Sequence, residues 1–426
     1  MKTHFLFTRI FLFSFAYGCK WNIEPTYLPC PVVTDVTPRS AKSGDTLRVS
    51  VKDMYADFKD TYQIMVGGKP LLKDAIIEFS DNSFVFKVPP GLNPAVQVSV
   101  EKLDSLERCE GNTSLVPNQA GRFFYYYKSV SKTIFAGTPD STDCATCFYN
   151  PAGLSIDPTG NIWVADRFHN SVVQLDAQGN RKNTFGRRDT SGCSDVVATS
   201  PGAVLLSNPT DLAIDKKGRV YIADRGGSTI RCICDSNNIK VLAGKCKNAE
   251  IDTSPADKDC LSTTLSSPSS IERDNDTLWI TDGGSIKKLT LTMGMDPCSI
   301  RTILPKTVEF IPVSLVISRH RTESGIIFAV DSRGILKSIT EQGGQYIIIP
   351  SPDRALGAPV ALESDGNGVL FIADQALNKI SALYPNGIMQ DIANVDKPSG
   401  IAFDKTQKTL YISGSKKQVI WKIIVE

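Results

Sequence analysis

A block of about 17 residues recurs six times in the last two thirds of the chain. The copies begin at Asn150, Asn208, Ser267, Pro312, Ala358 and Lys397, so they lie 58, 59, 45, 46 and 39 residues apart. The first two read "NPAGLSIDPTGNIWVAD" and "NPTDLAIDKKGRVYIAD". Each is a Pro-led apolar strand, a polar turn and a second apolar strand that ends in Asp. Periods of this length built from short strands predict a β-propeller with one sheet, or blade, per copy.

The flanking strands indicate how the ring closes. Runs such as "IWVA" and "VLFIA" are apolar at consecutive positions, as expected of strands buried on both faces. A third and a fourth strand follow in the earlier copies, but the last copy ends at "WKIIVE" without a fourth. Residues 131–137, "SKTIFAG", have the fourth-strand form and precede the first copy. We therefore expect a six-bladed propeller over residues 129–426 that an N-terminal strand closes.

The six copies resemble NHL repeats, most strongly in the first, second and fifth copies. The turn that NHL repeats fill with an Asn-His pair appears in the first copy in reversed order, as His169-Asn170. The resemblance spans residues 131–426 and implies a six-bladed NHL propeller.

A different all-β pattern precedes the repeats. Short β-branched and aromatic runs such as "TLRVSV", "SFVFKVPPG" and "RFFYYYK" alternate with Gly, Pro and Asp turns, which predicts a small β-sandwich over residues 31–128. The stretches "VVTDVTPRSAKSGDTLRVSV", "IMVGG" and "FKVPPG" resemble an immunoglobulin-like IPT/TIG domain. That resemblance implies a spacer or binding module. Cys30 and Cys109 lie near the ends of this segment and are a candidate disulfide pair.

The first 18 residues have the pattern of a signal peptide. Lys2 and Arg9 precede a short apolar run, and Ala16 and Gly18 are small residues before Cys19. The segment resembles a bacterial lipoprotein signal, which implies cleavage before Cys19 and a lipid on that residue, followed by a linker over residues 19–30. Ala16 departs from the Leu usual in such signals, and ordinary signal cleavage is the alternative. Either way we expect an exported protein, lipid-anchored at the cell envelope or surface, or otherwise secreted.

The cysteines also point to an oxidising compartment. Of the eleven Cys residues, ten remain once Cys19 is set aside, an even number that can pair fully. Cys246 and Cys260 share one loop and are a second candidate pair. Cys232 and Cys234 lie two apart on one strand, so we expect them to reach different partners.

Composition and motifs argue against several functions. Lys and Arg total 47 against 45 Asp and Glu, without long runs of one sign, so no nucleic-acid partner is expected, and a membrane is expected only through the lipid anchor. Outside the signal segment only His169 and His320 remain, which counts against zinc-dependent propeller lyases. The sequence has no G-x-S-x-G and no Gly-rich phosphate loop. No catalytic residue, metal site or cofactor is therefore assigned.

The Asp that ends the second strand recurs in five of the six copies. An Asp at a strand end accepts backbone N–H bonds and organises the following turn, and this structural interpretation is preferred. The alternative is a ring of carboxylates near the channel that holds Ca²⁺, as in lactonase-like propellers. The five residues are Asp166, Asp224, Asp282, Asp331 and Asp374.

Arg167 and Arg225 each follow one of these Asp residues, and either bond within their blades or extend over the propeller face. The loops that enter blades one to three are long and carry Cys, and they should rise on the same face. We predict a ligand-binding face that contains the five Asp residues with Arg167, Phe168, His169 and Arg225. The function expected is that of a non-enzymatic exported or cell-surface protein whose propeller face binds a protein or glycan. The alternative is a metal-dependent enzyme of the lactonase or lyase kind that uses channel carboxylates.

Overall fold

The computed structural model describes fourteen stretches of the chain: 32–37, 40–52, 62–66, 69–80, 82–89, 95–102, 122–193, 200–234, 239–246, 258–291, 298–318, 326–348, 356–384 and 388–426. They form two compact units. The predicted signal segment, Cys19, the Cys30–Cys109 pair and His320 lie outside these residues. None of the described helices has the length and apolar character needed to cross a membrane.

The described residues between 32 and 125 form an immunoglobulin-like β-sandwich of two sheets. The first sheet has the order β1 (Val32–Thr37), β3 (Thr46–Lys52), β7 (Ser83–Lys87) and β6 (Ile76–Ser80). The second has the order β2 (Ser40–Ala41), β9 (Arg122–Tyr125), β8 (Ala95–Lys102), β4 (Tyr62–Val66) and β5 (Lys69–Pro70), and the short helix η2 (Lys73–Ala75) precedes β6. Along β3, Leu47, Val49 and Val51 are buried while their neighbours are more exposed. This alternation is what one apolar face of a sheet requires.

The second unit is a six-bladed propeller, as predicted. Blade 1 contains β11 (Pro151–Ile156), β12 (Ile162–Asp166), β13 (Ser171–Leu175) and β14 (Arg181–Phe185). Blade 2 contains β15 (Pro209–Ile214), β16 (Val220–Asp224), β17 (Thr229–Ile233) and β18 (Ile239–Gly244). Blade 3 contains β20 (Pro268–Asp274), β21 (Thr277–Asp282), β22 (Ser285–Leu291), β23 (Cys298–Leu304) and the outer β19 (Lys258–Asp259).

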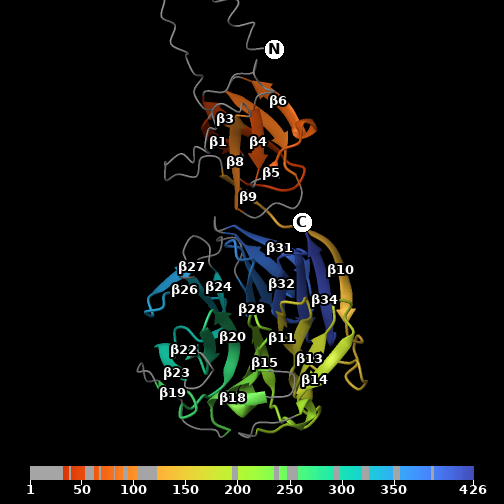
Figure 1. Cartoon of the computed structure of the whole chain (residues 1–426), viewed down its shortest axis with the longest axis vertical. Helices are drawn as coiled ribbons and strands as arrows, with labels where there is room; N and C mark the ends of the chain where they lie inside the picture. The colour runs from red at the N-terminus through yellow and green to blue at the C-terminus, as the bar shows by residue number, and fades with distance from the viewer. Residues whose placement is uncertain are drawn as a thin grey trace, which may run out of the picture. The chain divides into compact units, whose positions relative to one another are not determined.

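The remaining blades complete the ring. Blade 4 contains β24 (Pro312–Ser318), β25 (Ile326–Asp331), β26 (Leu336–Ile339) and β27 (Gln345–Ile348). Blade 5 contains β28 (Pro359–Ser364), β29 (Leu370–Asp374), β30 (Lys379–Leu383) and β31 (Met389–Asn394). Blade 6 contains β32 (Pro398–Asp404), β33 (Thr409–Gly414), β34 (Val419–Val425) and the donated β10 (Ser129–Ala136), which lies beside β34 in Figure 1. The predicted N-terminal closing strand is therefore confirmed.

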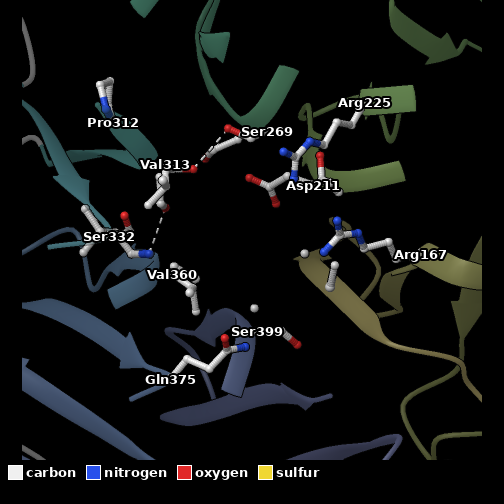
Figure 2. A pocket seen from close by; sticks show the side chains of 18 of the residues that line it. Arg167, Asp211, Arg225, Ser269, Pro312, Val313, Ser332, Val360, Gln375 and Ser399 are labelled. Atoms are coloured by element: carbon white, nitrogen blue, oxygen red, sulfur yellow. Dashed lines mark hydrogen bonds between the residues drawn. The ribbon is translucent and has the colours of Figure 1, made fainter. Parts of the chain in front are cut away.

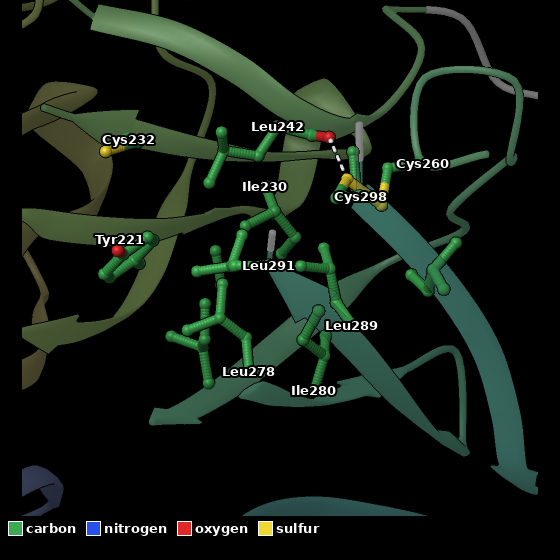
Figure 3. Packing of buried hydrophobic residues seen from close by; sticks show 14 of the residues in the cluster. Tyr221, Ile230, Cys232, Leu242, Cys260, Leu278, Ile280, Leu289, Leu291 and Cys298 are labelled. Carbon is green, nitrogen blue, oxygen red and sulfur yellow. Dashed lines mark hydrogen bonds between the residues drawn. A yellow bond between two sulfur atoms is a disulfide. The ribbon is translucent and has the colours of Figure 1, made fainter. Parts of the chain in front are cut away.

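The blades bury their faces against one another. The innermost strands pack in the order β11, β15, β20, β24, β28, β32 and back to β11. Between blades 2 and 3, Tyr221 and Ile230 of one blade meet Leu278 and Leu289 of the next in a continuous apolar layer (Figure 3). Such a layer exists only when both blades are present, which explains why the strands read as nearly continuous apolar runs.

The disulfides correct two predictions. The structure pairs Cys260 with Cys298 (Figure 3) and Cys193 with Cys246, so the predicted Cys246–Cys260 pair is wrong. The reason is that β19 places Asp259 opposite Ser299 on β23, which brings the next residue, Cys260, to the edge of blade 3. Closeness in sequence within one loop did not predict this strand pairing.

The other two disulfides are local. Cys232 is bonded to Cys234, so the expectation that these two reach different partners is also wrong. Cys144 is bonded to Cys147 in the loop before blade 1. All four disulfides of the described residues lie in the propeller. Three of them include a cysteine of a loop that leads into blades 1 to 3, whereas Cys232–Cys234 lies where β17 turns into β18.

Candidate binding site at the mouth of the propeller channel

The five strand-end Asp residues are structural. None is more than 1% exposed. Asp374 accepts the backbone N–H groups of Gly357 and Ala358 at 2.7 and 3.0 Å, and those of residues 376 and 377 at 3.1 and 3.0 Å. In the same way Asp224 accepts the N–H of Ser207 at 2.7 Å. Asp374 thus ties the loop that enters blade 5 to the turn after its second strand. Asp331 instead accepts the N–H groups of residues 333 and 335 in its own turn.

The preferred structural interpretation of these residues is therefore confirmed, and their placement on the binding face is wrong. Their oxygens point to loop backbone and to buried partners, because a desolvated carboxylate needs several donors to remain in the interior. His169 is also buried, at 2% exposure. Its Nδ1 lies 2.8 Å from Oδ2 of Asp166 and its Nε2 lies 3.0 Å from the carbonyl oxygen of Thr142, so it joins the turn to the preceding loop.

The residue after each strand-end position does reach the axis of the ring. In blades 1 and 2 the chain turns there through a one-turn helix, η3 (Arg167–His169) and η5 (Arg225–Gly227), closed by Asn170 and Ser228 in left-handed conformation. The six residues at this position line one pocket at the mouth of the channel: Arg167, Arg225, Gly283, Ser332, Gln375 and Ser415.

A second ring of residues comes from the innermost strands. Each of these strands begins with Pro and shows a register shift directly after it. Pro lacks the N–H that a regular ladder would use, so a β-bulge at this point is the expected outcome. The residues of these bulges line the same pocket, among them Gly153, Asp211, Ser270, Ser314, Ala361 and Gly400.

The pocket has a volume of about 530 Å³ and a mixed lining. Hydroxyl groups and the Gln375 amide come from several blades, while Ile311, Pro312 and Val313 form an apolar wall on blade 4. The hydroxyl of Ser269 reaches the carbonyl of Val313 in the next blade at 3.3 Å (Figure 2). A concave site of this size with a few fixed polar groups is typical of small-ligand recognition.

Two guanidinium groups from adjacent blades enter this pocket. Figure 2 shows Arg167 and Arg225 on the same side of it, with Asp211 beside them. Arg225 donates from Nε to Oγ of Ser267 at 2.8 Å, and Arg167 donates from Nε to Oδ1 of Asn208. Burial and then repulsion from Arg225 lower the pKa of Arg167. Among the described residues, no carboxylate pairs with either side chain.

Below the mouth, three carboxylates line a smaller cavity of about 170 Å³: those of Asp211, Glu272 and Glu363. Burial raises the pKa of Asp211 to about 6, although it accepts N–H bonds from Leu212 and Ile271 at 2.9 and 3.0 Å. Burial also raises the pKa of Glu272 and Glu363, and mutual repulsion adds to the rise for Glu272. These three groups therefore hold protons at higher pH than ordinary carboxyls.

This gives a prediction for pH dependence. Folded Asp211, with a pKa of about 6 against an ordinary 3.8, keeps a proton between about pH 4 and 6 that the unfolded chain releases. Its contribution to the free energy of unfolding is therefore present below about pH 4 and is lost as the pH rises through 6. Asp211→Asn removes that loss, so its stability relative to the wild type should rise by about 1–3 kcal/mol from pH 4 to pH 7 in urea unfolding.

Asp215→Asn is the matched control. Burial acts to raise the pKa of Asp215, but hydrogen bonds from the Arg219 amide, the Arg219 side chain and the Lys217 amide outweigh it and lower the pKa. The stability difference for this variant should change little from pH 4 to 7. It should change in the opposite direction only below the ordinary pKa of 3.8, where the unfolded chain binds a proton that folded Asp215 does not. If the stabilities of the two variants relative to the wild type changed with pH in the same way, the raised pKa of Asp211 would be contradicted.

The described residues contain no group of three His, Cys, Asp or Glu side chains placed to hold a metal ion. The five strand-end carboxylates are separated in their own blades, and the deeper carboxylates are held by inner-strand amides. No observation in the described part of the chain thus favours the Ca²⁺ site or the metal-dependent alternative.

Comparisons with known proteins agree with this architecture. The NHL repeat family model matches residues 148–175 and 206–233, the first two copies. A structural genomics protein of unknown function from Bacteroides thetaiotaomicron is similar over 95% of this chain and 99% of its own, with 13% identity and a TM-score of 0.54. The chain thus contains two segments that match NHL repeats, and they form blades 1 and 2 of a β-propeller that comes after an immunoglobulin-like sandwich in the sequence.

Two further solved structures are similar to this chain. One is an auxiliary nutrient binding protein from Bacteroides thetaiotaomicron, with 14% identity, 93% and 98% coverage and a TM-score of 0.49. The other is virginiamycin B lyase from Staphylococcus aureus, with 20% identity, 70% and 99% coverage and a TM-score of 0.46. No curated protein matches the sequence.

Sequence reasoning found two of the pocket residues, Arg167 and Arg225, and missed the rest. Phe168 is 42% exposed and lies beside the pocket, with its ring 5.3 Å from the Arg167 guanidinium carbon. The missed residues carry a positional signal that was available. An alignment of the six copies places most of them either directly after the strand-end position or one or two residues after the entry Pro.

Proposed function

We propose that this protein is an exported binding protein whose propeller holds part of a protein or glycan ligand in the channel-mouth pocket. The observation that carries the proposal is the pocket itself. All six blades contribute to it, and its lining offers hydrogen-bond donors and an apolar wall. A rigid ring with fixed polar groups suits binding, because little ordering is needed when the ligand arrives.

The loops around the pocket support the same proposal. Cys144–Cys147 stabilises the loop before blade 1, and Cys193–Cys246 joins the loops on either side of blade 2. Arg188 donates to the carbonyl oxygens of Cys144 and Thr142 at 2.7 and 3.0 Å, which fixes one loop against another. Crosslinked loops on the pocket face are stiff, which lowers the entropy that binding loses.

Export is part of the proposal. The Lys2–Gly18 pattern and the disulfide-rich propeller both favour an oxidising compartment. Within this proposal Cys19 carries the lipid anchor and residues 31–128 form an IPT/TIG spacer. Intact mass of the mature protein tests the anchor, because a diacylglyceryl group adds several hundred daltons.

A pocket-filling substitution tests the binding function. Ser332 is exposed at the pocket wall of blade 4, so Ser332→Trp should fill the mouth without a change of charge. Capture on glycan and host-protein arrays should fall at least 10-fold. Thr406→Trp is the control, because Thr406 lies on the exposed turn between β32 and β33, outside the pocket. Equal capture by both variants would place the binding function elsewhere.

A further inference from the structure

Among the residues that the structure describes, no carboxylate forms an ion pair with the positive charge of Arg167 or of Arg225. Each Nε is engaged, Arg167 with Asn208 and Arg225 with Ser267, so the guanidinium planes are fixed. Their Nη groups have no acceptor within the described residues. Such terminal N–H groups are the ones that bind a carboxylate in a bidentate manner.

Asp211 is the one carboxylate among the described residues that line the pocket, and it bonds to backbone and not to the two arginines. Both oxygens of Asp211 accept N–H groups of the inner strands, from Leu212 at 2.9 Å and from Ile271 at 3.0 Å. The positive charges of Arg167 and Arg225 repel each other, which destabilises the empty site. An anion bound between the two guanidinium groups relieves that repulsion. The pocket therefore selects for a ligand with a negative group.

An exposed aromatic pair lies beside the same arginine. Tyr149 and Phe168 are each 42% exposed, and their rings meet edge to face at 5.1 Å. The backbone N–H of Phe168 donates to the carbonyl of Tyr149 at 3.0 Å, so the pair is held against the rim of the pocket, which Asn150 and Arg167 line. Exposed rings next to a polar pocket offer an apolar surface to the C–H face of a sugar ring.

We infer that the ligand is an acidic saccharide whose carboxylate lies between Arg167 and Arg225 and whose ring packs on Phe168. This inference rests on the proposed binding function and names its ligand class. The hydroxyl-rich remainder of the pocket fits sugar hydroxyls, which both donate and accept hydrogen bonds. The volume of about 530 Å³ admits one or two sugar rings at the mouth.

The test uses the full-length protein and a panel of saccharides as probes. The panel contains oligomers of galacturonate, glucuronate and mannuronate and sialyllactose, each beside its methyl ester, with affinity measured by calorimetry. At least one acid should bind at least 10-fold more tightly than its ester, and the binding should weaken as salt rises. Arg167→Gln and Arg225→Gln should each weaken it about 10- to 100-fold, as expected for loss of a hydrogen bond to a charged group.

Three further variants complete the design. The lysine variants of the two arginines should restore part of the affinity, because charge remains while bidentate geometry is lost. Phe168→Ala should weaken the acid and the ester alike. Arg333→Gln, in blade 4 outside the pocket, should change neither.

The outcomes separate the two proposals. Equal binding of acids and esters would overturn the role of the arginine pair. If no acid binds while an acidic peptide is captured in a pocket-dependent manner, the saccharide inference is overturned and the binding function stands. If neither is captured and array binding survives Ser332→Trp, the proposed function itself is overturned.

Discussion

Replacing Arg231 with methionine is expected to lower the free energy of unfolding by about 3–5 kcal/mol, the loss typical of a buried ion pair that keeps one charge. Arg231 lies inside blade 2, where its Nε is 3.0 Å from Oδ2 of Asp224 and both side chains are at most 1% exposed. Burial raises the pKa of Asp224 to about 6 even with Arg231 in place. Without the guanidinium, the carboxyl must bind a proton or remain charged in the interior.

Arg333→Met provides the matched comparison. Arg333 pairs with the strand-end Asp331 of blade 4 at 2.7 Å, but its own side chain is 51% exposed. The backbone N–H groups of residues 333 and 335 also donate to Asp331, so that carboxylate keeps partners after the substitution. We expect a loss of about 1 kcal/mol or less in urea unfolding. Equal losses for the two variants would show that burial of the Arg231 pair is not what makes it costly to break.

Removing the Cys193–Cys246 disulfide with the double Cys→Ser variant is expected to lower stability by about 4 kcal/mol. The bond closes a loop with a sequence separation of 53 residues that includes all of blade 2. In the chain-entropy model, loss of the bond that closes a loop of this length greatly increases the conformational entropy of the unfolded chain. Thermal unfolding monitored by circular dichroism measures the loss.

The Cys144–Cys147 disulfide is the internal control, because its sequence separation is only three residues. The same model predicts that removal of this disulfide lowers the free energy of unfolding by about 2 kcal/mol. Arg231 also donates from Nη2 to the sulfur of Cys193 at 3.1 Å, so its ion pair and this disulfide share a contact. The loss of stability caused by Arg231→Met should therefore differ between the wild-type protein and the variant that lacks this disulfide. Simple additivity would contradict that coupling.

Much of the fold could be predicted from the sequence. The repeat period, the apolar runs and the missing fourth strand of the last copy are local or repeated signals. They were sufficient to predict six blades and closure of the ring by β10. The role of the strand-end Asp residues was equally accessible, since a residue that recurs in five copies serves the repeat. The NHL resemblance agreed with both conclusions.

The site was predictable only in part. Arg167 and Arg225 were found because they follow a recurrent Asp, but His169 and the Asp residues were assigned to a surface from which they are buried. A sequence position at the end of a strand does not specify whether a side chain points to the axis or into the loop. That choice depends on which donors the loop supplies, as Gly357 and Ala358 do for Asp374.

The amino-acid sequence by itself determined the number of blades, the strand that closes the ring and the class of fold, because these follow from hydrophobic periodicity. Only the tertiary structure decided which cysteines pair, that the Pro-led bulges of six strands line one pocket, and that two guanidinium groups from different blades share it. These depend on contacts between residues far apart in the chain. Their geometry is set when the ring closes and the inner strands pack around a common axis.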